Sequence, residues 1–242
     1  MRSSMISFAA TAVSLAALAA GCGGGSTGTT GNVGAGGEGG MMVGPITPTS
    51  GPYEPLAVGA SWTYHVNDKG VMYDKTSTVE AQEDAGGPKA GISAFRLRDT
   101  FPSESQLTWY QVDGDVVKRL HEQALDSTGA MKSEDWYDPY RLRVDATADH
   151  LTAGATYSNA FTDAHTSRSK PAATQSQNDG WKVDGVDEPV AVPAGNFASL
   201  HLTRTDSSDG STKSYWFVRG VGKVREATSA GHIEELTSYH QP

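Results

Sequence analysis

From residue 52 onward, the chain is patterned in short runs in which apolar and polar residues alternate. In the first of these runs, Trp62, Tyr64 and Val66 are separated by single polar residues. Successive side chains of a strand point to opposite faces, so this spacing places the three apolar side chains on one face. Ser93–Arg98 alternates in the same way, and no long run follows the period of a helix. The pattern therefore predicts a mainly β fold.

Turn sequences separate these runs. Asp113-Gly114 lies between two strand-like runs and predicts a hairpin with a two-residue turn, because such turns need positive φ angles. Pro193-Ala194-Gly195 and Ser207–Gly210 predict two further turns. Short strands joined by short turns are typical of an antiparallel meander. We therefore expect residues 52–242 to form a single antiparallel, curved sheet or an open half-barrel.

Some polar stretches interrupt or modify the alternation. Tyr73–Gln82 alternates around polar residues, which predicts a strand whose outer face is wet. Ser169–Gly180 is polar throughout and is predicted to be a loop. Glu134–Asp138 combines acids with flat aromatic rings, as sugar-binding loops do, but a solvated loop with one aromatic ring tucked beneath it is the simpler interpretation.

The N-terminus follows a different pattern. Arg2 precedes the charge-free apolar run Met5–Ala20, which is followed by Gly21 and Cys22. A cationic start, an apolar core and small residues before a cleavage point are typical of a secretory signal peptide. The run is short for a membrane-spanning helix, which needs about 20 apolar residues. We therefore predict a signal helix within a signal peptide that covers residues 1–21.

The segment Leu-Ala-Ala-Gly-Cys resembles a bacterial lipobox, in which the cysteine is acylated and becomes the first residue of the mature chain. Leu18 lies one position further from the cysteine than in that pattern. Cys22 is the only cysteine of the chain and follows the small residues of the cleavage point, so we predict that it is lipidated and that its acyl chains bind a membrane. Ordinary cleavage near Ala20, which leaves a bare thiol, is the alternative.

Composition adds a tether and restricts the partners. Residues 22–51 are rich in glycine and cannot bury enough apolar surface to fold, so we expect a disordered linker. The formal net charge of −9 disfavours nucleic acid as a partner. Gly23 follows the cysteine, which resembles the sorting pattern for the outer membrane of a Gram-negative cell.

Three segments of the folded part resemble a group of uncharacterised bacterial lipoproteins. They are Val58–Tyr64 (VGASWTY), Val192–Phe197 (VPAGNF) and Gly220–Arg225 (GVGKVR). The resemblance implies no activity. Such proteins are similar in outline to periplasmic lipoprotein-carrier half-barrels, which implies a curved sheet with a concave side.

One apolar set forms either the core or a pocket for an acyl chain, and the core is the favoured interpretation. Its members are Trp62, Tyr64, Phe95, Leu97, Trp109, Phe161, Phe197, Trp216 and Phe217. His232, Glu234 and His240 can converge on a sheet, but we expect no metal site and no other cofactor. No Gly-x-Ser-x-Gly motif is present, and the only thiol lies at the anchor, so we predict no catalytic residue.

The leading hypothesis from the sequence is an envelope lipoprotein, not an enzyme, that binds a ligand or a protein partner. A carrier or chaperone for lipid or lipoprotein is the first alternative and requires an open apolar cavity. A hydrolase of envelope polymers is the second, and it requires titratable side chains that converge in a cleft.

Overall fold

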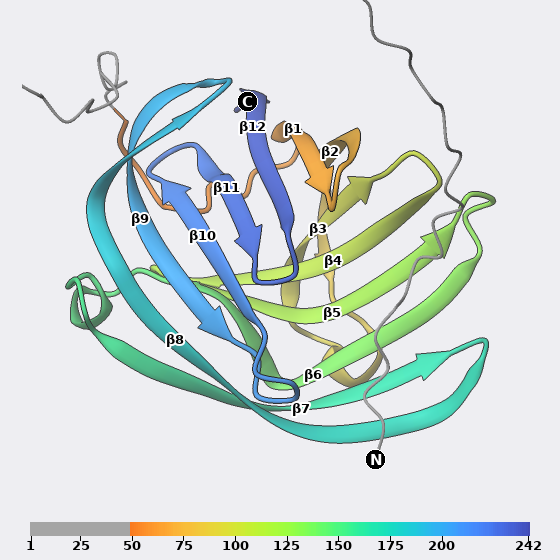
Figure 1. The fold of residues 1–242 in the computed structure, drawn as a ribbon. Helices are drawn as coiled ribbons and strands as arrows, with labels where there is room; N and C mark the ends of the chain where they lie inside the picture. Colours follow the sequence, from red (N-terminus) through yellow and green to blue (C-terminus); the bar gives the residue numbers. More distant parts are fainter. Residues whose placement is uncertain (1–48) are drawn as a thin grey trace, which may run out of the picture. The chain divides into compact units, whose positions relative to one another are not determined.

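The computed structural model describes residues 49–242, which form a closed barrel of twelve antiparallel strands (Figure 1). The strands are β1 (Ser61–Asp68), β2 (Val71–Asp84), β3 (Ser93–Thr100), β4 (Glu104–Asp113), β5 (Val116–Asp126), β6 (Met131–Asp145), β7 (Thr156–Ser167), β8 (Lys170–Val192), β9 (Gly195–Thr205), β10 (Thr212–Val218), β11 (Gly222–Thr228) and β12 (His232–His240). Two short 3₁₀ helices, η1 (Gly87–Lys89) and η2 (Ala148–His150), lie in the connections. The predicted signal helix, the lipidation of Cys22 and the glycine-rich linker up to residue 48 fall outside the described residues and stay predictions.

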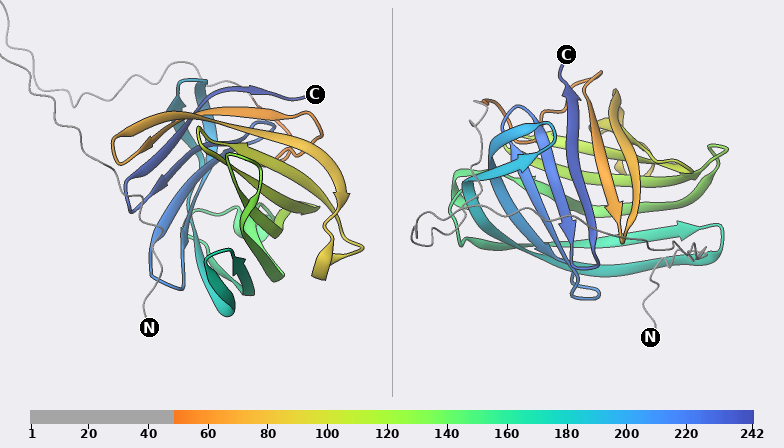
Figure 2. Two further views of the ribbon diagram at one scale, coloured as in Figure 1. Left: turned by 90° about the vertical axis from the view of Figure 1, so that its right-hand side faces the viewer. Right: turned by 45° about the horizontal axis from the view of Figure 1, so that its top comes forward.

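The mainly β, antiparallel prediction is confirmed, but the predicted open half-barrel is wrong. Each strand pairs with its neighbours in the sequence, and β1 also pairs with β12, from Ser61 opposite His240 to Asp68 opposite His232. Both views of Figure 2 and Figure 1 show these two strands side by side. The pairing removes the two unpaired edges that an open sheet would expose. Alternation along a strand is the same in an open and in a closed sheet, so it does not reveal this closure.

Two predicted loops are strands. Ser176 and Gln177, in the middle of the predicted loop 169–180, pair with β7, and Trp136 of the predicted loop 134–138 pairs with both β5 and β7. Polar residues can occupy this part of the β7–β8 hairpin because backbone hydrogen bonds hold its strands together without an apolar face. The segment 134–138 of β6 instead buries Tyr137, whose ring packs against Phe161 at 5.8 Å.

The predicted turns are confirmed in place, one of them with a shift. Asp113 pairs with Val116, so the two-residue turn is Gly114-Asp115 instead of Asp113-Gly114. Gly114 has a φ of 59°, the left-handed conformation that glycine adopts without strain. The turn at Pro193-Ala194 joins Val192 to its partner Gly195.

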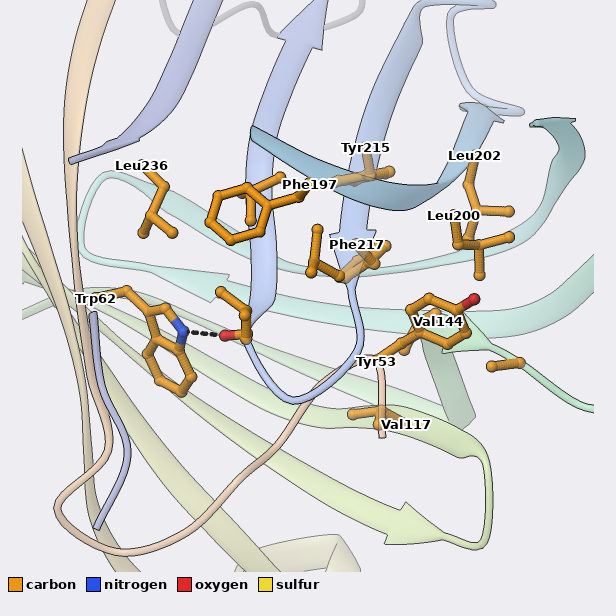
Figure 3. Packing of buried hydrophobic residues seen from close by; sticks show 14 of the residues in the cluster. Tyr53, Trp62, Val117, Val144, Phe197, Leu200, Leu202, Tyr215, Phe217 and Leu236 are labelled. Atoms are coloured by element: carbon orange, nitrogen blue, oxygen red, sulfur yellow. Dashed lines mark hydrogen bonds between the residues drawn. The ribbon is translucent and has the colours of Figure 1, made fainter. Parts of the chain in front are cut away.

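One end of the barrel interior is filled by apolar side chains, and we call it the apolar end. It is built around a layer of fully buried residues that Figure 3 shows at close range, including Phe197, Leu200, Phe217 and Leu236. The indole of Trp62 donates a hydrogen bond to the carbonyl oxygen of Val221 in the β10–β11 turn. These contacts anchor the first strand to the tenth and eleventh.

The segment that precedes β1 helps to close the apolar end. The backbone N–H of Gly220 donates to the carbonyl of Pro52 at 2.7 Å, and the guanidinium of Arg219 lies 4.3 Å from the centre of the Tyr53 ring. Tyr53 itself is buried in the core cluster. The turn between β10 and β11 and the chain before β1 therefore cover this end together.

A second apolar cluster lies on the outer face of the barrel, beneath the β2–β3 connection. It contains Ala85, Ala94, Leu107, Trp109, Leu120 and Leu125. Beside it, the ring of His121 stacks between Trp109 at 4.2 Å and Trp136 at 3.6 Å. A Cβ atom on Gly87 would come within 2.7 Å of the Trp136 ring, so η1 packs closely only because residue 87 is a glycine. Within residues 49–242, no helix is long and apolar enough to cross a membrane.

Candidate functional site

The other half of the barrel interior, which we call the charged end, contains a cavity of about 280 Å³. Ten of its lining side chains are formally charged: Glu54, Lys75, Asp99, Arg119, Glu122, Arg143, Lys213, Lys223, Glu226 and Glu234. Phe101, Gln106 and His232 also line it and are half-buried, and because apolar side chains fill the opposite end of the barrel, we infer that solvent reaches the cavity on this side. These residues lie beside the β3–β4 and β11–β12 turns, opposite the apolar end.

Strand register explains why charges face inward here. Tyr64 lies opposite Lys75 in the pairing of β1 with β2, and Val66 lies opposite Glu234 in the pairing of β1 with β12. Glu226 lies opposite Glu234 in the pairing of β11 with β12. Residues directly opposite one another share a face of the sheet, so the inward positions of β1 carry these charged neighbours into the interior.

Three lysines hold two buried glutamates. Glu234 accepts hydrogen bonds from Lys75 Nζ at 2.5 Å and from Lys223 Nζ at 2.6 Å. Lys223 Nζ also contacts Glu226 at 2.7 Å, and Lys213 Nζ contacts the other oxygen of Glu226 at 2.8 Å. Burial alone would raise the pKa of Glu234, but Lys223 and Lys75 hold that pKa well below its ordinary value. Both glutamates are therefore anionic.

The same two glutamates resemble a metal site in geometry only. Donor atoms of Glu226, His232 and Glu234 lie within 4.8 Å of one another. The carboxylate oxygens that would bind a cation already accept from three ammonium groups, which a metal ion would have to displace. His240, the third member of the set considered from the sequence, is exposed and pairs with Ser61 at the far end of β12.

Two arginines form the adjoining wall of the cavity. Arg119 donates to Glu122 at 2.7 Å and to the hydroxyl of Tyr110 at 3.0 Å. Arg143 makes one long hydrogen bond, of 3.4 Å, to Glu54. The Nε of Arg143 and the Oε2 of Glu54 are buried without a hydrogen-bond partner. Burial alone would lower the pKa of Arg143, but the opposing effect of Glu54 raises it above its ordinary value, so its guanidinium stays charged.

A separate acidic group lies outside the residues that line the cavity. His165 Nδ1 lies 2.6 Å from Asp135, and Asp163 Oδ1 is buried without a hydrogen-bond partner. Burial, reinforced by the negative charge of Asp135, raises the pKa of Asp163 to about 6. None of these three residues lines the cavity.

The structure distributes the apolar set predicted from the sequence over four environments. Trp62, Tyr64 and Leu97 are buried and line the charged cavity, whereas Phe161, Phe197 and Phe217 are buried without lining it. Phe95 and Trp216 are half-buried and pack against the core, and Trp109 belongs to the outer cluster. The set therefore does not enclose a single apolar pocket.

Sequence reasoning missed the charged residues of the site. Lys75 and Ser77 have the same strand parity as Tyr73 and Val79, so the inner face of β2 was visible in the alternation. A lysine in a polar strand is usually exposed, so the alternation by itself does not predict that Lys75 lies inside the barrel. The chain matches no protein-family model, no curated protein and no solved structure.

Proposed function

We propose that the barrel is a non-enzymatic binding module of the cell envelope that admits a small polar molecule into the charged end. The observation that carries this proposal is the cavity of about 280 Å³ with ten charged side chains on its wall. Ligand sites usually have volumes of about 300–1,000 Å³ with a few convergent polar groups. The cavity is near the lower limit of that range, which suits a molecule the size of a small metabolite.

The character of the wall argues against a lipid carrier. An acyl chain in this cavity would contact buried ammonium, guanidinium and carboxylate groups, and it would remove water from them without offering hydrogen bonds. Lys75, Lys223 and Glu234 are each almost fully buried on the cavity side of the barrel. The apolar side chains that could favour a lipid pack against one another at the apolar end instead.

Hydrolysis of an envelope polymer has weaker support than binding. A general acid near neutral pH needs a raised pKa, and Asp163 has one, but it does not line the cavity. Glu226 and Glu234 do line it, yet lysines hold the pKa of each below its ordinary value. These carboxylates are therefore suited to remain charged and not to transfer protons.

Filling the cavity tests the binding function. Gln106→Trp places a large ring at the solvent side of the cavity, and Gln111→Trp makes the same change on the outer face of β4 as a matched control. We expect native mass spectrometry of protein purified from its own cells to find a small polar molecule on the wild type and on the control, but not on Gln106→Trp. A molecule retained equally by all three proteins, or found on none of them, contradicts the proposal.

We also propose that acyl chains on Cys22 anchor the domain in the envelope, in an outer membrane. Cys22→Ala removes the only sulfur to which a thioether-linked lipid can be attached. Two or more acyl chains give stable anchoring. We therefore expect the variant to move from the membrane fraction to the soluble fraction on cell fractionation. An unchanged membrane fraction would mean that the anchor is not at this residue.

A further inference from the structure

The charges on the cavity wall compensate one another almost completely. Five cations face five carboxylates, so the formal sum is zero without His232. Most of these side chains form close ion pairs, such as Lys75 with Glu234 at 2.5 Å and Arg119 with Glu122 at 2.7 Å. A ligand with a net charge would leave one charge uncompensated in a poorly solvated interior, which is costly. The wall therefore favours an occupant whose own charges sum to zero.

Arg143 is the cation with the most unused hydrogen-bonding capacity. A guanidinium has five N–H donors, and Arg143 uses one of them, in the 3.4 Å bond to Glu54. Its side chain is only 11% exposed, and the Phe217 ring lies 5.0 Å from its central carbon. A charged fork of donors in this setting is what binds a carboxylate through two parallel hydrogen bonds.

Asp99 is the corresponding carboxylate. It accepts a hydrogen bond from the hydroxyl of Ser77, and within residues 49–242 it forms no ion pair. It lies on β3 one residue before the end of the strand, close to Phe101, at the side where the cavity approaches solvent. Arg143 pairs with Glu54, from the segment that covers the apolar end. The incompletely paired cation and anion thus lie toward opposite sides of the cavity.

On the basis of the proposed binding function, we propose that the occupant is a small zwitterion of the amino-carboxylate class. Its carboxylate points inward and accepts from Arg143, and its ammonium points toward solvent and donates to Asp99. This arrangement provides an acceptor for the unused N–H donors of Arg143 and gives Asp99 an ion pair. It also leaves the total charge of the barrel interior unchanged.

The experiment is a calorimetric titration with ω-amino acids of two to eight carbons and with analogues that lack one pole. We expect one member of the series to bind best, and its carboxylate-only and amine-only analogues to bind at least about tenfold more weakly, because each loses a charged hydrogen bond. If the carboxylate-only analogue, or an uncharged diol of the same length, binds as tightly as the best ω-amino acid, the proposal of a zwitterionic ligand is wrong.

Variants of Asp99 and Arg143 test which residue binds the ammonium group of the ligand and which binds its carboxylate. Asp99→Asn should weaken binding of the best ω-amino acid about tenfold and leave the carboxylate-only analogue unchanged. Arg143→Lys keeps the positive charge but loses the two parallel N–H donors. It should therefore weaken binding of both the ω-amino acid and its carboxylate-only analogue, and leave binding of the amine-only analogue unchanged. Asp74→Asn, on the exposed outer face of β2, should change none of them. The inference is wrong if Asp99→Asn weakens binding of the ω-amino acid and of its carboxylate-only analogue equally.

The cavity-filling test separates this inference from the proposed function. If no ω-amino acid binds but Gln106→Trp still loses a molecule carried by the wild type, the zwitterion is wrong and the binding function stands. If Gln106→Trp and the wild type also carry the same molecules, both proposals fail. Circular dichroism melts verify that each variant is folded before its titration is interpreted.

Discussion

The two halves of the barrel interior are buried to the same extent but are held together differently. At the apolar end, Phe197 and Phe217 are at most 1% exposed, and at the charged end Lys75 and Glu234 are each 4% exposed. The first pair loses contact with water and gains stability in proportion to its apolar area. The second pair exchanges hydration for ion pairs, an exchange that yields little net stability.

This difference indicates a division of labour within one barrel. Apolar packing fixes the shape of the barrel at one end, so the other end can carry charged groups whose contribution to folding is small. Burial alone therefore does not identify a core, because the buried residues of the segment 49–242 include charged members of a candidate site as well as the apolar core.

Truncation at the apolar end should have the largest effect. Phe197→Ala leaves a void among fully buried side chains, so we expect the free energy of unfolding to fall by about 4 kcal/mol. Urea denaturation measures this loss. Phe95→Ala, at a half-buried position that packs against the same cluster, is the matched control and should cost about half as much. Equal losses would mean that the apolar end is not the main source of stability.

Removal of one buried charge should have a somewhat smaller effect. Glu234→Gln leaves Lys75 and Lys223 without their shared anion, and we expect a loss of about 3 kcal/mol at pH 7. The pKa of Glu234 is lower in the folded than in the unfolded protein, so its contribution is complete well above the ordinary value of 4.5 and declines as the pH falls below it. The difference between wild type and variant should shrink in parallel on acidification. A constant difference would contradict the assignment.

The smallest expected effect has the opposite sign. Because the pKa of Asp163 is raised to about 6, the folded protein binds its proton more tightly than the unfolded chain, and the carboxyl destabilises the fold increasingly as the pH rises from about 4 to 6. Asp163→Asn should therefore stabilise the protein by about 1 kcal/mol at pH 7, a value that is reduced because solvent partly screens the group. At pH 4 the substitution should leave the free energy of unfolding unchanged. Thermal unfolding at the two pH values measures it. A variant less stable than wild type at pH 7 would show that the group is favourably paired.

Local pattern was sufficient to predict most of the strands but not their closure. Alternation around Trp62 and the turn at Pro193-Ala194 are local signals, and both are confirmed. The pairing of Ser61 with His240 joins residues almost a whole domain apart, and no local pattern encodes it. The polar strand around Gln177 was missed because its hydrogen bonds come from the backbone, which the sequence pattern does not report.

The candidate site was harder to predict than the fold. Glu226 and Glu234 lie on the neighbouring strands β11 and β12, but Lys75 lies on β2 and comes beside them only because β1 pairs with β12 and closes the barrel. Each of these residues by itself is typical of an exposed strand position. The ion pairs between these residues depend on the register of strands that are distant in the sequence, so the local sequence pattern does not predict them.

An even number of strands returns the chain to the side from which it started. β1 begins at Ser61 beside the last residue of β12, His240, and the segment around Pro52 lies against the β10–β11 turn at that same end. A fluorophore or surface linker attached after Pro242 therefore starts opposite the side where solvent reaches the cavity. The protein can be immobilised for ligand measurements by its C-terminus with the entrance left unobstructed.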